Sequence, residues 1–229
     1  MDYSSWSPVY AAILRDFGFP RGADETARDE LAARTVPFDH TRLSFLSGAR
    51  VAIAGAGPSL EAELDVARDA DAVLAASTAT DTLRAAGIDV ALMVTDIDKN
   101  PATIRTLTRE RTPVAVHAHG DNIPAIRREV PTFVRENVLP TTQAEPTPPV
   151  ENFGGFTDGD RAAFLADHFG ARELTFLGWD FDDQSVGAMK AKKLAWAERL
   201  LYWLERRRSE RFSILDGRRD SIDTSALPL

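Results

Sequence analysis

The stretch VALMVTDIDKN, residues 90–100, decides how this 229-residue chain can fold. Its apolar run is nearly continuous up to Thr95, whereas a half-exposed strand would alternate apolar and polar residues. Such a run is typical of a parallel sheet that helices cover on both faces, where ligands bind beyond the carboxyl ends of the strands. Asp96, Asp98 and Lys99 follow directly. The stretch therefore predicts either a strand that carries two carboxylates into an active site or a strand that ends in a polar turn.

Similar apolar runs recur on both sides of this stretch and alternate with amphipathic segments. We expect strands at 50–55, 72–77, 90–96, 113–118, 173–179 and 211–215, and a weaker one at 137–142. We expect helices near 59–69, 79–86, 100–110, 122–130, 158–169 and 188–208, and two earlier ones over 7–17 and 23–34, the last with Asp24 as its N-cap. This alternation predicts an α/β fold with a mostly parallel sheet and helices on both faces, a Rossmann-like three-layer sandwich. A helical N-terminal segment (1–47) is expected to precede the α/β catalytic domain (48–215), and an irregular tail (216–229) to follow it.

The composition excludes several classes of protein. Without cysteine there is no disulfide, thiol nucleophile or cysteine-ligated metal. A formal net charge of −8 argues against a general nucleic-acid-binding protein, which would carry a basic face. No apolar run approaches the roughly 20 residues that span a bilayer, and the start of the chain lacks the features of a signal peptide. We therefore expect a cytoplasmic protein that binds neither nucleic acid nor membrane.

The junction GAGPSL, residues 55–60, places small residues between a predicted strand and a predicted helix. Such a turn lets backbone N–H groups approach an anion at a helix N-terminus, and Ser59 can cap the helix or bind a phosphate. A dinucleotide fingerprint needs a third glycine where Leu60 stands, so a Rossmann dehydrogenase is disfavoured while nucleotide binding survives. A purely structural tight turn is the alternative. At the next junction, Ser77 offers a hydroxyl to phosphate or ribose, or caps a helix.

The two aspartates of the opening stretch suggest a metal site. Asp96 and Asp98 lie two residues apart, so in an extended segment both side chains point the same way. Converging carboxylates repel one another unless a cation lies between them, and Mg²⁺ binds one or two such oxygens together with phosphates. We favour this site over the alternative in which Asp98 only turns or caps the chain before NPATIRTL (100–107).

The segment VAVHAHGDN (114–122) ends another predicted strand. His117 and His119 share the alternation of the strand end, and Asp121 and Asn122 follow a glycine. A His–x–His pair can bind zinc, but no third ligand is evident. Neutral imidazoles beside phosphates, or a proton acceptor for a substrate hydroxyl, are equally compatible with the pattern.

The segment NFGGFTDGDRAAF (152–164) begins inside a loop rich in Pro and Gly, 140–157, which is long enough to be a lid or a binding loop. Thr157 or Asp158 is expected to cap the helix that follows. Arg161 in the first helical turn opposes the helix dipole, which makes it a candidate for phosphate contact. Three side chains of the loop can hold a flat heterocycle or simply pack: Asn152, Phe153 and Phe156.

After LGWDFDDQ (177–184), where Asp180 and Asp182 again lie two apart, the chain places three of its four lysines at the start of a predicted helix: Lys190, Lys192 and Lys193. Lysines at a helix N-terminus oppose the dipole, so an anionic ligand such as triphosphate explains them, and a solvated helix face is the alternative. Further along, three residues widen the apolar face and mark a candidate subunit contact, which leaves a homodimer open: Trp196, Leu200 and Trp203.

The glycine turn, the paired aspartates, the histidines and the lysines all fall at one edge of the predicted sheet, and together they suit a metal-bound polyphosphate. In their order along the chain, the motifs GAGPSL, TDID (95–98), HAHGDN (117–122), NFGGFTDGDRA and LGWDF resemble the archaeal 6-hydroxymethyl-7,8-dihydropterin pyrophosphokinase family over most of residues 48–215. The catalytic part is similar to that of thiamine pyrophosphokinases. The resemblance implies an ATP- and Mg²⁺-dependent transfer of pyrophosphate to the pterin hydroxymethyl group, with release of AMP, in archaeal folate or tetrahydromethanopterin biosynthesis.

The resemblance also implies roles for individual residues. Asp96 and Asp98 would hold Mg²⁺, with Asp121 as a third ligand, and His117 or His119 would orient phosphate or accept the hydroxyl proton. Binding of ATP and its phosphates would fall to Gly55, Gly57, Ser59, Ser77, Asn122, Arg161, Lys190, Lys192 and Lys193. As our own candidates for binding the hydroxymethyl pterin, we expect Asn152, Gly155, Phe156, Thr157, Asp158 and Asp180. Two alternatives stay open: a nucleotide-sugar-dependent glycosyltransferase-like protein of a surface-glycosylation system, and a non-catalytic nucleotide-binding module.

Overall fold

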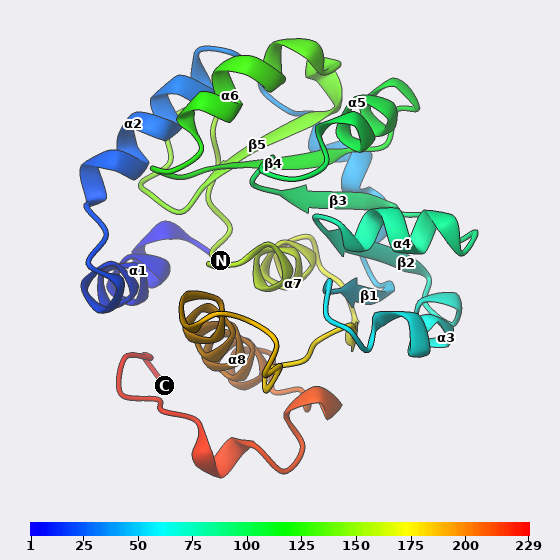
Figure 1. Ribbon diagram of the computed structural model, residues 1–229, viewed down its shortest axis with the longest axis vertical. Coiled ribbons are helices and arrows are strands. Elements are labelled where there is room, and N and C mark those ends of the chain that lie inside the picture. The colour runs from blue at the N-terminus through cyan, green and yellow to red at the C-terminus, as the bar shows by residue number, and fades with distance from the viewer.

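The computed structural model describes residues 1–229 and contains one six-stranded sheet with the order β5-β4-β3-β2-β1-β6 (Figure 1). Every neighbouring pair of strands is parallel. The strands are β1 (Arg50–Ala54), β2 (Ala72–Ala76), β3 (Leu92–Thr95), β4 (Val114–Ala118), β5 (Val138–Thr142) and β6 (Glu173–Leu177). The predicted strands before residue 180 are thus confirmed, including the weak one at 137–142.

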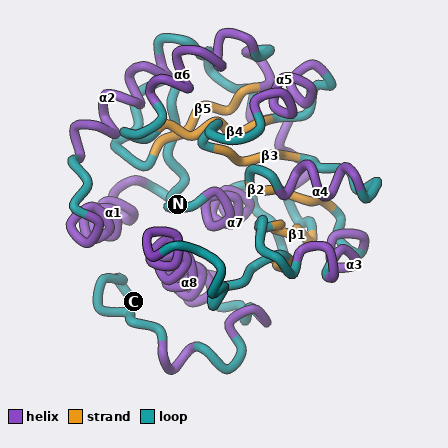
Figure 2. Tube along the Cα trace, viewed as in Figure 1, coloured by secondary structure: helices purple, strands orange, loops and turns teal.

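Helices cover both faces of the sheet, which Figure 2 shows as a central layer. They are α1 (Tyr3–Phe17), α2 (Arg21–Ala32), α3 (Leu64–Arg68), α4 (Ala79–Ala85), α5 (Pro101–Arg109), α6 (Ile123–Glu129), α7 (Asp158–His168) and α8 (Ala188–Arg208). Val51 and Ile53 of β1 face the core cluster shared with α1, α7 and α8, whereas Ala52 and Ala54 face the cluster shared with α3 and α4. Because successive strand residues point to opposite faces, an all-apolar strand needs this cover on both sides. The predicted three-layer α/β fold is confirmed.

The structure corrects several local predictions. The strand predicted at 211–215 is wrong, because Ser213–Leu215 form a 3₁₀ turn that buries Leu215 instead of extending the sheet. The helix predicted at 59–69 is broken into a 3₁₀ turn, Leu60–Ala62, and the short α3. Asp24 is not an N-cap: Pro20 holds that position of α2, and Asp24 is buried within the first turn.

The apolar face of α8 is internal. Trp196, Leu200 and Trp203 are all at most 2% exposed and belong to the core cluster shared with α1 and α7, so the predicted subunit contact on this face is wrong. None of the helices combines the length and the apolar character that a membrane crossing requires.

The long segment 140–157 is packed against the rest of the molecule. Its first residues form the end of β5, and only residues 145–148 of it are exposed. Phe153 and Phe156 belong to the main core cluster. A segment buried in this way does not open and close as a lid, so its contribution to a site is a fixed wall.

Candidate active site

A cavity of about 700 Å³ opens at the carboxyl ends of the strands. Each of the six strands contributes to its wall a residue that directly follows or lies close after the strand: Gly55, Ser77, Asp96, His119, Gln143 and Gly178. Residues of helices α2, α7 and α8 also line the cavity. The cavity thus lies where the parallel topology predicts a ligand site.

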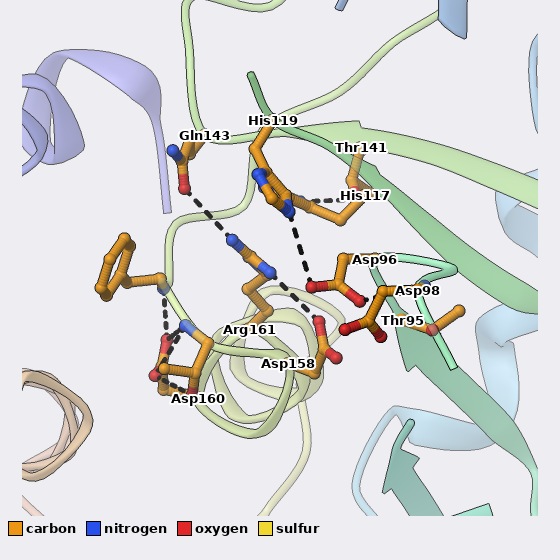
Figure 3. A network of polar contacts seen from close by, with 12 residues as sticks. Thr95, Asp96, Asp98, His117, His119, Thr141, Gln143, Asp158, Asp160 and Arg161 are labelled. Carbon is orange, nitrogen blue, oxygen red and sulfur yellow. Dashed lines mark hydrogen bonds and ion pairs between the residues drawn. The ribbon is translucent and has the colours of Figure 1, made fainter. Parts of the chain in front are cut away.

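Asp96, Asp98 and Asp158 form an acidic cluster in this cavity (Figure 3). The cluster depends on a sharp turn rather than on an extended strand. The Oγ1 atom of Thr95 accepts the N–H of Ile97 at 3.0 Å, and Ile97 adopts a left-handed φ of 60°. The N–H of Asp98 then lies 3.4 Å from Oδ1 of Asp96. Asp158, in the first turn of α7, points toward both of them.

The pKa values of the acidic cluster reflect its crowding. Burial raises the pKa of Asp98 to about 6, and the neighbouring Asp96 adds to the rise. Burial, followed by the charge of Asp96, raises the pKa of Asp158 to about 7, although Arg161 opposes the rise. Burial alone would raise the pKa of Asp96, but hydrogen bonds with His119 and Asp98 hold it below its ordinary value. Ionisation of all three carboxylates at once is therefore unfavourable without a cation.

Four basic side chains line the same cavity, and we call them the basic rim: Lys99, Arg161, Lys190 and Lys193. Arg161 is 7% exposed, and its Nη1 lies 3.1 Å from Oδ1 of Asp158, while its Nη2 donates to Gln143. Its Nε is buried without a partner. The pKa of Lys190 is lowered, first by partial burial at the cavity edge and then by the nearby Lys99 and Lys193. Of the four, only Arg161 forms an ion pair with a carboxylate, so the three lysines remain available to an anionic ligand.

The third predicted lysine lies outside the site. The Nζ atom of Lys192 pairs with Oδ1 of Asp16 at 2.9 Å and lies over the ring of Phe17, 4.6 Å from its centroid. Both partners belong to α1. Lys192 therefore fastens α8 to α1, and its predicted role in phosphate binding is wrong.

Of the two histidines, only His119 lines the cavity. Its Nε2 lies 3.5 Å from Oδ2 of Asp96, and its Nδ1 accepts the N–H of Asp121 at 3.4 Å. His117 is 2% exposed, its Nδ1 lies 3.1 Å from Oγ1 of Thr141, and burial lowers its pKa well below the ordinary value. A neutral histidine behind the cavity wall cannot reach a substrate, so the predicted catalytic role of His117 is not supported.

Two further predictions concern the ends of β3 and β4. Asp121 is exposed at the cavity edge, and no three histidine or acidic side chains form a ready-made metal site, so Asp121 as a third metal ligand is not supported. Asn122 is buried, and its Nδ2 donates to the backbone oxygens of Asp96 and His117 at 2.8 and 2.7 Å. Asn122 is thus a brace between the two strand ends, and its predicted phosphate contact is wrong.

The glycine turn after β1 is satisfied by the protein itself. The N–H of Gly55 donates to the last carbonyl of β6, and the N–H of Gly57 donates to Gly178. The N–H and Oγ of Ser59 both donate to Oδ2 of Asp180, at 3.0 and 2.9 Å. A Cβ on Gly57 would lie 2.3 Å from that Oδ2, so the glycine is needed for close packing. These contacts leave the N–H groups of Gly55 and Gly57 bonded within the protein, and the predicted phosphate cradle of Gly55, Gly57 and Ser59 stays a prediction, since both glycines and Asp180 line the cavity.

The hydroxyl of Ser77, which follows β2, has no hydrogen-bond partner, unlike the hydroxyl of Ser59. Ser77 has a left-handed φ of 47°, and its Oγ is buried. Ser77 lines the cavity and its Oγ has no hydrogen-bond partner, so its predicted contact with phosphate stays a prediction that the fold allows.

The segment before α7 contributes some of its predicted residues. Phe156, Thr157 and Asp158 line the cavity, and Thr157 is the N-cap of α7 as predicted. Asn152 is wrong as a substrate contact, since both polar atoms of its side chain are bonded to the loop backbone. Its Nδ2 donates to the carbonyl oxygen of Ala144, and its Oδ1 accepts the N–H of Gly154. Gly155 does not line the cavity either. Its left-handed φ of 91° lets the loop pass so close to α7 that a Cβ there would clash with the α7 backbone.

The sequence analysis does not place Asp24 and Gln143 in the site, yet both line the cavity. Nε2 of Gln143 donates to Oδ2 of Asp24 at 2.7 Å, and its Oε1 accepts from Arg161 at 3.1 Å. Gln143 directly follows β5, and its place at a strand end is the signal that could have found it. Asp24 lies in the N-terminal segment, where only the fold brings it to the cavity.

Comparisons with known proteins point to one family. Residues 30–185 match the model of a protein family described as 6-hydroxymethylpterin diphosphokinase MptE-like. The chain is 37% identical over 225 residues to a 6-hydroxymethyl-7,8-dihydropterin pyrophosphokinase of Methanothermobacter thermautotrophicus, with 90% of this chain and 96% of the relative covered. Enzymes of the same name from Pyrococcus furiosus and Methanocaldococcus jannaschii are 37% and 31% identical, with 90% of this chain and 95% and 96% of those relatives covered.

Proposed function

The chain belongs to the MptE-like 6-hydroxymethylpterin diphosphokinase family, and from this premise we propose that it transfers pyrophosphate from ATP to the hydroxymethyl group of 6-hydroxymethyl-7,8-dihydropterin in a Mg²⁺-dependent reaction. Its relatives are named as pyrophosphokinases, so the chain is an enzyme. The products would be AMP and the pterin diphosphate. We further propose that this reaction serves archaeal folate or tetrahydromethanopterin biosynthesis and takes place in the cytoplasm.

The observation that carries the proposal is the meeting of the acidic cluster and the basic rim in one cavity. Transfer of a phosphoryl-type group needs charge neutralisation and alignment more than a covalent nucleophile. In the proposed step, the hydroxymethyl oxygen bonds to the β-phosphorus and loses its proton. The bond from that phosphorus to the oxygen bridging the α- and β-phosphates breaks, and AMP leaves with the bridging oxygen.

The residues of the acidic cluster fit a divalent cation. They offer only carboxylate oxygens, which Mg²⁺ prefers, and two or three ionised carboxylates that crowd together are stabilised by a cation. Burial first, and then the neighbouring Asp96, raises the pKa values of Asp98 and Asp158. Asp96 and Asp98 would hold the ion together with phosphate oxygens, since no complete protein cage exists. When bound, Mg²⁺ would neutralise phosphate charge and help to align the polyphosphate.

The basic rim would hold the remaining phosphate charge. Arg161 is fixed by Asp158 and Gln143 and keeps its Nε free, while Lys190 and Lys193 reach the cavity from the start of α8. Ser77 adds an unpaired hydroxyl. His119 is oriented by Asp96 and by a backbone N–H, which suits a positioning role rather than the role of a free base.

The proposal is tested by product analysis. The purified chain is incubated with ATP, Mg²⁺ and 6-hydroxymethyl-7,8-dihydropterin, and nucleotides are separated by anion-exchange chromatography. We expect equimolar AMP and pterin diphosphate. Formation of ADP would contradict the pyrophosphoryl step. If no nucleotide product forms while a CMP- or UDP-sugar raises the melting temperature, the proposal is overturned in favour of a sugar transferase; ATP binding without turnover would favour a binding module.

A further inference from the structure

Asp24 is a buried carboxylate in the wall of the cavity, and the proposed phosphate chemistry does not use it. It is 5% exposed, and no lysine, arginine or histidine nitrogen lies within ion-pairing distance of it. Three neutral donors hold it: the hydroxyl of Tyr10 at 2.8 Å, Nε2 of Gln143 at 2.7 Å and the N–H of Gly120 at 2.8 Å. Buried charges in proteins are normally paired, so an unpaired one that faces a cavity is costly unless a ligand completes it.

The two oxygens of Asp24 are not equally used. Oδ2 accepts from both Tyr10 and Gln143, whereas Oδ1 accepts only from Gly120. An ionised carboxylate offers about four lone-pair positions, so Oδ1 retains capacity for another donor. The group that completes this site must therefore bring N–H or O–H donors.

The wall around Asp24 suits a flat ring. Phe19, Pro20, Ala23 and Phe156 line this end of the cavity. The ring of Phe156 is supported by Phe17, with centroids 5.1 Å apart, and Lys193 of the basic rim lies 6.0 Å from its centroid. A planar heterocycle against these residues would have a carboxylate at one edge and the phosphate-binding groups at the other.

Asp24 and the acidic cluster are joined by one short segment. The N–H of Gly120 holds Asp24, and the ring of the preceding His119 faces Asp96. A second link runs through Gln143 and Arg161 to Asp158. A molecule held at Asp24 therefore points its far end toward the groups that bind polyphosphate.

We propose that Asp24 is the specificity determinant for the pterin, and that its carboxylate accepts the adjacent N–H groups of the 2-amino-4-oxo edge of the ring. This inference rests on the proposed function and adds where the pterin ring binds and which of its edges faces Asp24. An adenine ring presents an acceptor nitrogen beside its amino group, and a carboxylate repels that acceptor. Asp24 thereby directs the pterin, and not the adenine of ATP, to this end of the cavity.

The first test is the substitution Asp24→Asn, with Asp29→Asn on the exposed side of the same helix as the matched control. With ATP saturating, we expect the KM for 6-hydroxymethyl-7,8-dihydropterin to rise roughly 10–100-fold. The reason is that the asparagine amide places an N–H donor opposite an N–H donor of the pterin. The KM for ATP stays within about twofold of wild type in both variants. A pterin KM within about twofold of wild type, or an equal rise of both KM values, would overturn the inference.

The second test needs no variant and remains informative if Asp24→Asn does not fold. Oxidised 6-hydroxymethylpterin and its 2-oxo analogue, 6-hydroxymethyllumazine, are compared as competitive inhibitors of the wild-type reaction. We expect the 2-oxo compound to bind at least about tenfold more weakly, since its oxygen faces the carboxylate. Equal inhibition of the wild type contradicts the inference. Because the wild type must release AMP for either test, failure of the proposed function is recognised separately.

Discussion

The ends of β1 and β3 differ in a way that their sequences do not show. Both strands are buried, and both end in a turn with residues that suit a nucleotide. After β1, the N–H groups of Gly55 and Gly57 and the hydroxyl of Ser59 are bonded within the protein. After β3, carboxylates crowd together in a cavity whose three lysines, Lys99, Lys190 and Lys193, form no ion pair. The β1 turn is bonded within the protein and the β3 end is not, and for this reason we place the proposed phosphate and metal site at the β3 end.

The largest effect should come from the acidic cluster. We expect Asp96→Asn to lower kcat/KM for AMP release by about a thousandfold or more, because it removes charge that the reaction needs at the phosphates. Its melting temperature should stay close to that of wild type. The matched control is Asp182→Asn, which changes the exposed member of the second aspartate pair and should leave turnover unchanged. If Asp96→Asn retains activity, the assignment of the β3 end as the catalytic centre is wrong.

The next largest effect on activity should differ between the lysines at the start of α8. Lys190→Met and Lys193→Met should each reduce kcat/KM for ATP roughly 10–100-fold, since both ammonium groups face the cavity. Lys192→Met is the control, because Lys192 pairs with Asp16 instead. It should reduce kcat/KM by less than about twofold. Equal losses in the three variants would show that helix charge in general, and not the cavity, is responsible.

A smaller effect concerns stability and its dependence on pH. The pKa of Asp158 is raised to about 7 in the folded chain. At a pH between its unfolded and folded pKa values, the folded chain therefore holds a proton on Asp158 that the unfolded chain has lost. Between about pH 4 and pH 7 the contribution of Asp158 to stability therefore falls as the pH rises. Asp158→Asn, without divalent cations, should raise the melting temperature by about 3–6 °C at about pH 8, an effect of roughly 1–2 kcal/mol.

The gain from Asp158→Asn should shrink as the pH falls and disappear below about pH 4. Thermal melts of wild type and variant across this range provide the measurement. A gain that stays constant with pH would mean that crowded charge is not its cause.

The smallest effect on activity should come from the β1 turn. Ser59→Ala removes the hydrogen bond from the hydroxyl of Ser59 to Asp180. The backbone N–H of residue 59 still donates to Asp180. We expect kcat/KM for AMP release to change by less than about threefold, with a loss of stability of about 1 kcal/mol from the missing hydroxyl bond. A large loss of turnover at unchanged stability would return the phosphate site to the β1 turn.

The sequence predicts the fold well because the strands are continuous apolar runs and the helices have a clear period. The 3₁₀ turn at Ser213–Leu215 escapes prediction, since a short apolar run such as RFSIL suits either a strand or a buried turn. The acidic and basic residues at the strand ends are predicted because parallel topology alone brings them together.

Other parts of the site depend on contacts that sequence spacing does not encode. His117 and His119 look equivalent along the strand, yet only the second reaches the cavity. Ser59 looks like a phosphate ligand until the fold places Asp180, 121 residues away in sequence, within hydrogen-bonding distance of it. Asp24 comes from a helix outside the predicted catalytic domain and is brought to the cavity by the packing of α2.

Mn²⁺ binding can show whether the polyphosphate and its metal bind at the β3 end. Electron paramagnetic resonance measures free Mn²⁺ in the presence of α,β-methylene-ATP, which cannot be cleaved at the reacting bond. We predict that wild type and Ser59→Ala form the same ternary complex and that Asp96→Asn binds Mn²⁺ at least about tenfold more weakly. Unchanged Mn²⁺ binding in Asp96→Asn, with loss of binding in Ser59→Ala, would contradict binding at the β3 end.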